Sequence, residues 1–569
     1  MRMKQIILVL TVVLLLAGAV YVFVIRQGRA ADPLDYLPGD TLALIDLHQP
    51  AALYGKYRQS RLGQRMNSIR WDDLLRQFGA SEVDAGIVQE KVDHLQAFFD
   101  GPVFRELFGG RAVLALLPAA HSSAGGNVSL LPSESLVLIA SPLHQPDVAE
   151  LLVPLLAGDS QSATESYQDR EIRTFILADN MNLAVVASDG LLLASFSIDT
   201  VKRCLDLALR QAAAGSDRLN GNPDYLSLRQ RSGGRGEQFA YGNVQAVTRF
   251  LFSVSGLGPG MTESSILPWA TNFGHGAFFC DNKTERLNCT AILQKTPDGA
   301  GAVKPSAVDN TLAVAPADLL LHFWTNLPDI SRVAAGLRHN PQFRHAIGSA
   351  DEWLVQKAGL TFPDFLSLFD SPISLTVTGV RGNGFVPLPR LYGRLAVKDG
   401  ERLRQALTAL LAGKNQTSKD VAGFQVHTLM LAGGLLQPSW AIREGQVLFA
   451  DSLEQFEQSL LQPEAPLTES PRFRQVDVGL AAPNNMTTYV NYPRFLDGLQ
   501  QFAAWTATIL AMMDQERGGL ARALVDLVVT PVLDGMKMFA AGSLRLLDVP
   551  SELVMESALS FTEEAGEEE

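Results

Sequence analysis

The nine histidines of this 569-residue sequence are the side chains best suited to hold a metal ion. No two of them have the His-x-x-x-His or His-Glu-x-x-His spacing that brings two imidazoles to one face of a helix. The closest pair, His339 and His345, is spaced so that the two side chains would lie on different helix faces. We therefore expect no metal site and no cofactor.

Motifs for phosphate binding and nucleophilic catalysis do not occur either. Gly413-Lys414 is no phosphate-binding loop, because Thr408 replaces the first glycine and Asn415 replaces the Ser or Thr that follows the lysine. The glycine-rich segment 379–384 joins two strands of a predicted hairpin, whereas a phosphate loop precedes a helix. No Gly-x-Ser-x-Gly elbow is present. The sequence therefore identifies no catalytic residue.

The three cysteines have two different settings. Cys204 lies on the apolar face of a predicted helix, where a small core side chain is the expected role. Cys280 and Cys289 flank the segment DNKTERLN, which is predicted to be a hairpin turn, so the two side chains would face each other across two strands. In an oxidising compartment this spacing predicts a structural disulfide, with two buried free thiols as the alternative.

Charge excludes one class of partner. The formal net charge is −13, and no cluster of Lys and Arg interleaved with aromatic residues stands out. A nucleic-acid-binding surface needs such a basic cluster, so we expect no nucleic-acid partner. The acidic segment 563–569 is predicted to be a solvated tail.

The apolar run Ile6–Val24 is the clearest element in the sequence, and it contains no charged residue. As a helix it would span about 28 Å, close to the hydrocarbon thickness of a bilayer. The apolar core of a cleaved signal peptide is shorter, which favours an uncleaved anchor. Arg2 and Lys4 favour a cytoplasmic N-terminus. We predict a single-pass protein of the inner membrane, with the bulk of the chain periplasmic or otherwise extracytoplasmic.

The opening YLPGDTLALIDL, residues 36–47, has a later counterpart in VAPADLLLHFWT, residues 314–325. In each, a Pro-x-Asp turn precedes an apolar run that is typical of a buried strand. The matches continue in the same order along the chain. They include two amphipathic helices around Leu152 and Leu407, each followed by a glycine suited to a left-handed C-terminus, at Gly158 and Gly413.

Turn and capping signals follow the same repeated order. Gly190 and Gly445 are each predicted to lie in a tight hairpin turn. Ser197 and Ser452 are predicted to cap the helices that come next. We interpret the chain as two tandem homologous repeats, although generic strand and helix patterns can also align by chance.

The predicted fold class is α+β: an N-terminal transmembrane helix, then two homologous repeats, each a mostly antiparallel sheet with amphipathic helices. The chain is predicted to divide into five segments. Residues 1–31 form the cytoplasmic stub, anchor and juxtamembrane segment, 32–294 repeat one, 295–310 a linker, 311–562 repeat two and 563–569 the tail.

The anchor together with the Tyr36-Leu37-Pro38-x-Asp40-Thr41 opening resembles the bacterial envelope family catalogued as domain of unknown function three-three-five-two. The second copy keeps only Pro316 and Asp318 of that opening. The resemblance implies an envelope location and the fold of the extracytoplasmic part, and it implies no activity.

One segment of repeat two, residues 496–542, is an apolar insertion. It is either a cover for the core or a docking face for lipid or a protein partner. The candidate face consists of Trp505, Ile509, Leu510 and Met513.

The sequence favours the first of three functions, and the other two are alternatives. The first is an anchored binding or scaffolding protein without catalysis, with the membrane and a protein or lipid as its partners. The second is a carrier or sensor of a lipid or other hydrophobic ligand. The third is an enzyme whose site is assembled from scattered residues such as Asp40, Asp46 or Asp318.

Overall fold

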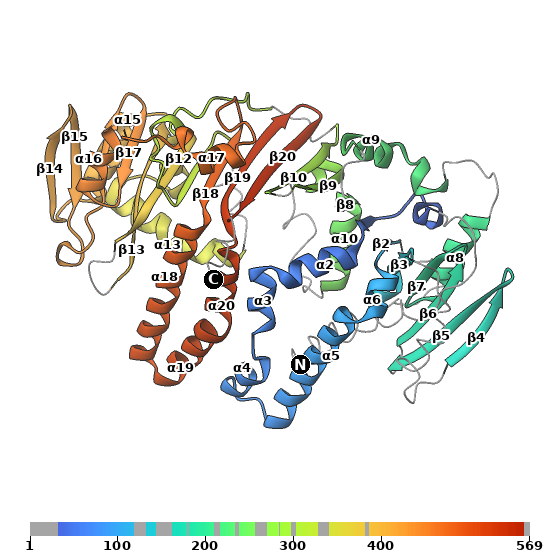
Figure 1. Cartoon of the computed structure of the whole chain (residues 1–569). Helices are drawn as coiled ribbons and strands as arrows, with labels where there is room; N and C mark the ends of the chain where they lie inside the picture. The colour runs from blue at the N-terminus through green and yellow to red at the C-terminus, as the bar shows by residue number, and fades with distance from the viewer. Residues whose placement is uncertain are drawn as a thin grey trace. The chain divides into compact units, whose positions relative to one another are not determined.

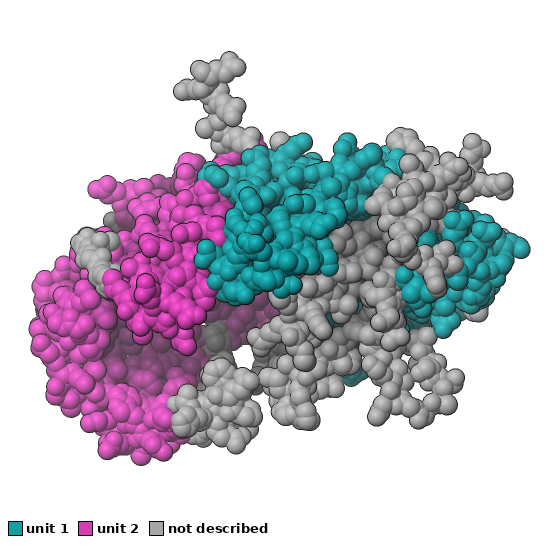
Figure 2. All heavy atoms as spheres, turned by 90° about the horizontal axis from the view of Figure 1, so that it is seen from below, with its two compact units in different colours: residues 1–282, 289–300 teal, residues 283–288, 301–569 magenta. Residues whose placement is uncertain are grey.

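The computed structural model describes most of the chain from residue 32 to residue 562. The described residues are 32–118, 132–143, 162–178, 181–209, 217–233, 238–255, 270–283, 285–297, 303–327, 330, 341–381, 386–461 and 463–562. They divide into two compact units, which are coloured separately in Figure 2. Unit 1 comprises residues 1–282 and 289–300, and unit 2 comprises residues 283–288 and 301–569.

The first half of the described chain contains ten strands and a series of short helices (Figure 1). The strands are β1 (Ala43–His48), β2 (Arg111–Leu116), β3 (Leu136–Ala140), β4 (Ser162–Tyr167), β5 (Arg170–Ala178), β6 (Met181–Ser188), β7 (Leu191–Ser195), β8 (Gln238–Asn243), β9 (Phe273–Lys283) and β10 (Arg286–Lys295). The helices are α2 (Pro50–Gln59), α3 (Arg61–Asn67), α4 (Trp71–Gln77), α5 (Glu82–Asp100), α6 (Pro102–Leu107), α8 (Ile198–Leu209), α9 (Pro223–Arg231) and α10 (Val244–Ser255).

The second half of the described chain contains ten further strands. They are β11 (Leu321–Thr325), β12 (Phe369–Arg381), β13 (Leu388–Val397), β14 (Gln416–Val421), β15 (Phe424–Leu429), β16 (Ser439–Arg443), β17 (Gln446–Ala450), β18 (Met486–Asn491), β19 (Phe539–Val549) and β20 (Glu552–Phe561). The helices are α13 (Pro341–Ala358), α14 (Phe362–Leu366), α15 (Gly400–Leu410), α16 (Leu453–Leu460), α17 (Pro471–Val476), α18 (Tyr492–Met513), α19 (Gln515–Leu524) and α20 (Thr530–Met536).

Strand pairing follows the same order in both halves. In the first half the order is β4-β5-β6-β7-β3-β2-β1-β8-β9-β10. In the second half it is β14-β15-β16-β17-β13-β12-β11-β18-β19-β20. Neighbouring strands from β4 to β9 in the first order, and from β14 to β20 in the second, run antiparallel. Pairs of consecutive strands, such as β6–β7 and β16–β17, have the antiparallel direction that a hairpin connection requires.

The fold class predicted from the sequence is wrong about the sheets. We expected a separate sheet in each repeat, but hydrogen-bonded pairing assigns all twenty strands of the described residues to one antiparallel sheet. Periodicity and turn residues specify local hairpins, whereas an edge strand's unpaired N–H and C=O groups leave its further partner open. We also expected a transmembrane helix, and no helix among the described residues is long and apolar enough to cross a membrane. The run 6–24 lies outside the described residues.

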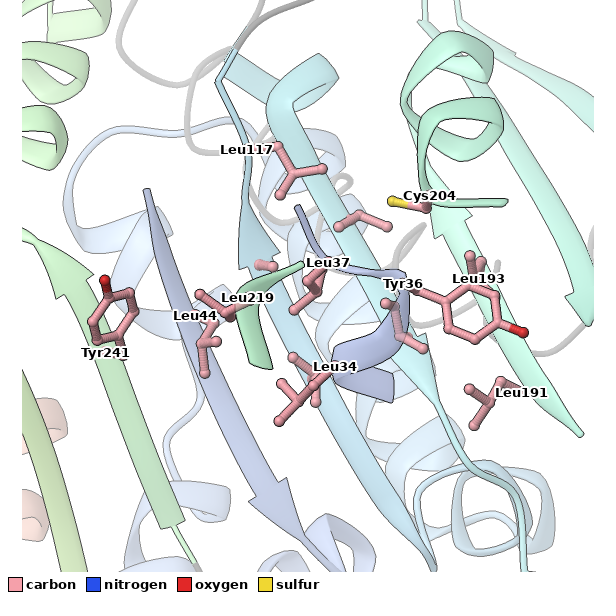
Figure 3. Packing of buried hydrophobic residues seen from close by; sticks show 14 of the residues in the cluster. Leu34, Tyr36, Leu37, Leu44, Leu117, Leu191, Leu193, Cys204, Leu219 and Tyr241 are labelled. Carbon is pink, nitrogen blue, oxygen red and sulfur yellow. The ribbon is translucent and has the colours of Figure 1, made fainter. Parts of the chain in front are cut away.

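The Tyr-Leu-Pro opening contributes to the core of unit 1. Tyr36 and Leu37 are buried in one apolar cluster with Leu193 and Cys204 (Figure 3). The Tyr36 hydroxyl donates to Asp189 Oδ2 at 2.9 Å, in the turn between β6 and β7. Burial, the largest cause, raises the pKa of Tyr36 above its usual range, so the phenol stays protonated and keeps this hydrogen bond. The opening therefore ties the start of unit 1 to a distant hairpin.

The predicted turns and caps are confirmed where they fall on described residues. Gly190 and Gly445 have φ of 80° and 73°, in the left-handed region that suits glycine, in the β6–β7 and β16–β17 hairpins. Ser452 Oγ accepts from the backbone N–H of Gln455, which caps α16. Gly413 has φ of 75°, as predicted after an amphipathic helix. Its proposed counterpart Gly158, like the helix predicted around Leu152, lies outside the described residues.

In unit 2, the part of the sheet around β13 and β15–β17 has a helix on each face. Because side chains alternate along a strand, Val447 and Leu448 of β17 point to opposite faces. Val447 packs with Leu403 of α15, and Leu448 packs with Phe456 of α16. The α15 face holds the site described next.

Candidate functional site

The carboxylates that the sequence offered for catalysis are each paired with an arginine. Asp46 is completely buried in β1, and its two oxygens accept from Arg111 Nε and Nη2 at 2.8 and 2.9 Å. Asp40 accepts from Arg203 Nη2 at 2.8 Å, and Asp318 is 2.9 Å from Arg494. Each of the three is therefore part of an ion pair of its own, and no pair of free carboxylates is formed from them for acid–base chemistry.

A buried histidine–aspartate pair was missed by the sequence reasoning. His322 Nε2 lies 2.8 Å from Asp309 Oδ2, and both side chains are completely buried. His322 Nδ1 contacts Thr376 Oγ1 at 3.0 Å, and Thr487 Oγ1 donates to Asp309 at 3.1 Å. Burial by itself raises the pKa of Asp309, but hydrogen bonds and charge from His322, with donors from Thr311, outweigh it and lower that pKa. Sealed from solvent, this network stabilises the fold and has no room for a substrate.

No three His, Cys, Asp or Glu side chains of the described ranges form a cluster that could hold a metal ion. Cys204 is buried in the core, and this burial raises the pKa of its thiol to about 12, which keeps it unreactive. Cys280 and Cys289 form a disulfide across the β9–β10 hairpin, with Cα atoms 4.1 Å apart. This bond links the two strands of the hairpin.

Unit 2 contains an apolar cavity of about 600 Å³ on the α15 face of the sheet. Its walls come from α15, from strands β12, β13, β15, β16 and β17, and from the loop between β15 and β16. The volume lies in the range of small-molecule sites, which is about 300–1,000 Å³. The lining residues are Phe369, Arg381, Leu388, Pro389, Leu391, Leu403, Leu407, Leu411, Leu429, Leu431, Leu435, Leu436, Pro438, Ser439, Trp440, Val447, Phe449, Ala450 and Asp451.

Helix α15 presents its leucines to the cavity because of its periodicity. Leu403, Leu407 and Leu411 recur every four residues, which places them on one side of the helix. Asp399 caps the N-terminus, where its Oδ1 accepts from the backbone N–H of Arg402 at 2.9 Å. The helix is therefore fixed at its start, and its apolar side borders the cavity.

A glycine sets the position of one aromatic wall. A Cβ added to Gly393 of β13 would come within 2.5 Å of Phe449 Cζ and 2.4 Å of the Ser374 carbonyl oxygen. The Phe449 ring of β17 therefore lies directly over the glycine. Because residue 393 has no side chain, the Phe449 ring packs directly against the sheet. The ring also lines the cavity.

The mouth of the cavity is an apolar loop. Leu431, Leu435 and Leu436 line the cavity and are also exposed, Leu435 by 50%. Two backbone hydrogen bonds between Leu431 and Leu436, of 2.9 and 3.3 Å, close the loop on itself. Leucines that are exposed together at the rim of a hollow are typical of a site that an apolar ligand covers.

Arg381 and Asp451 form a charged end of the cavity lining. Arg381 Nη2 donates to Ser452 Oγ at 2.9 Å and lies 3.7 Å from Asp451 Oδ2 and 3.9 Å from Glu454 Oε2. Burial is the largest cause of the raised pKa of Asp451. Two carboxylates thus surround the guanidinium at this end.

The face predicted from the sequence lies on α18, away from the lining of this cavity. Trp505, Ile509 and Leu510 are half-buried, and Met513 is 79% exposed. Only Leu496 and Ala507 of α18 are fully buried. A cover for the core would bury nearly all of its apolar face, so this helix is not a closed cover.

Two features of the sequence belong to the cavity wall, and neither of them shows that an open space lies behind it. The apolar face of the helix around Leu407 was recognised, but a face that lines a cavity has the same pattern as one that packs tightly in a core. The second feature is the group of three leucines next to Gly433 and Gly434 in the loop. The sequence alone does not show that a cavity lies beneath these leucines.

No protein-family model matches the chain, and no curated protein is similar to its sequence. Among solved structures, chains of TP0453 in crystal forms III and IV match with 12% identity, and the match covers 47% of this chain and 81% of each TP0453 chain. The TM-scores are 0.26 and 0.24. Likeness at that level carries no argument about function, which leaves the chain's own cavity as the guide.

Proposed function

We propose that the protein binds a hydrophobic ligand, such as a lipid chain, in the apolar cavity of unit 2. The observation that carries the proposal is a cavity of about 600 Å³ whose lining is almost entirely apolar. Atoms that line an empty apolar space lack van der Waals partners on one side. A hydrophobic chain would supply those partners and would cover the exposed leucines at the mouth, at about 25 cal/mol for each Å² of apolar surface removed from water.

Trp440 offers a direct assay because it lines the cavity. We expect a dodecanol carrying bromine on its chain to quench the fluorescence of Trp440 in the full-length protein with a saturable dependence on concentration. Trp440→Phe should lose that saturable component, since the other tryptophans of the described residues, Trp71, Trp324, Trp353 and Trp505, do not line the cavity. Equal quenching in the wild-type protein and Trp440→Phe would place the ligand elsewhere and refute the proposal.

A charge at the mouth should weaken binding without unfolding the chain. Leu435→Asp puts a carboxylate at a position that is already 50% exposed, so the fold should tolerate it. We expect at least a tenfold weaker affinity for dodecanol, because the charge would have to be desolvated beside the ligand. Leu461→Asp is the matched control, since Leu461 is 68% exposed, belongs to the same unit and does not line the cavity. Equal effects of the two substitutions would contradict the assignment.

The exposed face of α18 favours a second role in binding a protein partner. Phe502, Met512 and Met513 are all exposed, and methionine-rich surfaces adapt to different partners. A photocrosslinking residue at position 513 should then capture a defined protein in cells, while the same residue at the exposed position 461 should not. Failure to capture any protein from position 513 would remove this second role.

A further inference from the structure

A second, smaller hollow adjoins the apolar cavity. Its volume is about 220 Å³, room for several water molecules of about 30 Å³ each. Leu407, Leu411 and Trp440 line both spaces. We call this smaller hollow the annex. Its remaining lining residues are Arg404, Thr408, Gln416, Gln425, His427 and Ile442.

The annex differs from the cavity in chemistry because neighbouring faces of the same elements differ in sequence. On α15, Leu403 lines the cavity and the next residue, Arg404, lines the annex. On β15, Gln425, His427 and Leu429 share one face, since they alternate along the strand. The first two line the annex and Leu429 lines the cavity. One continuous face of unit 2 thus changes from polar to apolar.

Trp440 lines both the cavity and the annex. Its ring stacks on His427, with the ring centroids 5.8 Å apart and an angle of 23° between the planes. Strand pairing holds the two residues together, because His427 of β15 is the register partner of Trp440 of β16. The imidazole therefore has a fixed position at the boundary between the two hollows.

From this arrangement we infer that the ligand is an amphiphile with an anionic head group. The inference rests on the proposed function. The apolar chain lies in the cavity, and the carboxylate or phosphate lies in the annex and accepts hydrogen bonds from Arg404 and His427. Gln416, Gln425 and Thr408 supply further neutral hydrogen-bonding groups around the head group.

Charge decides whether the head group lies in the annex or at the Arg381 end of the cavity. Among the residues that the structure describes, no Asp or Glu lines the annex, and Arg404 contributes a positive charge to its lining. The acidic partner of Arg404 is Glu401 on the same helix, with a 65% exposed side chain, and such surface pairs are weak. Arg381, at the cavity's own polar end, already has Asp451 and Glu454 beside it. An anion there would meet two carboxylates, so the annex is the favoured end.

Four probes with the same C12 chain test the inference on the full-length protein, each used below its micelle concentration. They are dodecanoate, dodecyl phosphate, dodecanol and dodecyltrimethylammonium. We expect the two anions to bind about tenfold or more tightly than dodecanol, from charge-assisted hydrogen bonds, and the cation to bind most weakly. A preference for dodecanoate identifies a free fatty acid as the ligand class, and a preference for dodecyl phosphate identifies a phosphate-bearing lipid.

Variants locate the head group. Arg404→Gln should abolish the preference for anions and leave the affinity for dodecanol unchanged, which also shows that the variant is folded. Arg402→Gln, on the same helix but outside both linings, should keep the preference. Loss of the preference in Arg381→Gln instead of Arg404→Gln would overturn the inference, and so would equal affinity for all four probes. Failure of all four to bind would refute the proposed function itself.

Discussion

Replacing Asp46 by Asn should destabilise the protein far more than replacing Asp40 by Asn. Both aspartates accept two hydrogen bonds from an arginine, Asp46 at 2.8 and 2.9 Å from Arg111 and Asp40 at 2.8 and 2.9 Å from Arg203. The Asp46 side chain is completely buried, whereas that of Asp40 is 60% exposed. The two substitutions therefore compare an arginine-paired carboxylate in the interior with one at the surface.

The expected loss of stability depends on the ion pairs that each arginine retains after the substitution. Removing one partner of a buried pair costs about 3–5 kcal/mol, because the other charge stays desolvated. Arg111 retains Asp32 at 2.9 Å, but Arg229, 3.5 Å from Asp46, also loses its carboxylate. We therefore expect about 3 kcal/mol for Asp46→Asn, at the low end of that range. An exposed pair contributes about 0–1 kcal/mol, which is the expectation for Asp40→Asn.

Urea denaturation followed by circular dichroism measures the difference. At an m-value of about 3 kcal/mol/M, a loss of about 3 kcal/mol lowers the midpoint by about 1 M, while Asp40→Asn should shift it by less than about 0.3 M. Native-state hydrogen exchange of the β1 amides should assign the loss to unit 1. Equal midpoint shifts in the two variants would show that burial of the Asp46 pair does not determine its contribution to stability.

Two further predictions concern unit 2. Gly393→Ala should lower the free energy of unfolding by about 1–3 kcal/mol, because its Cβ would overlap the Ser374 carbonyl oxygen and Phe449. Gly379→Ala in the neighbouring strand β12, with nothing within 4 Å, is the control, and equal losses in the urea midpoint would exclude the overlap as the cause. The lowered pKa of Asp309 means that its contribution to stability is present above the unfolded pKa of about 3.9 and is lost as pH falls through the folded value. Urea midpoints measured from pH 7 down to pH 2 should fall more steeply below about pH 4 in the wild-type protein than in Asp309→Asn, and parallel curves would remove Asp309 from the acid response.

Local features were predictable from the sequence because they depend on neighbouring residues. A glycine after Asp189 or Glu444, between two apolar runs, indicates a hairpin turn whatever surrounds it, and both turns have the expected positive φ. Ser452 caps α16 for the same local reason. The spacing of Cys280 and Cys289 around one turn likewise placed the two side chains opposite each other.

The arrangement of the strands in the sheet and the burial of individual side chains depend on contacts between residues far apart in the chain. The order of apolar runs indicated strands, but the partner of an edge strand is selected by three-dimensional packing, and this is why a single sheet replaced the two that were expected. Nor does the sequence distinguish Asp46, buried between two arginines, from Asp40 at the surface, because burial is a property of the assembled fold.

The sequence by itself determined that α15 has an apolar side and that Gly190 and Gly445 lie in hairpin turns. Only the tertiary structure decided that the leucines of α15 border an open space, because a periodic pattern records which side of a helix is apolar and not how closely the opposite wall approaches. The distance between α15 and the sheet depends on groups far apart in the chain. Among them are Gly393, which lets the Phe449 ring approach the sheet closely, and Trp440, which lines both the apolar cavity and the polar annex.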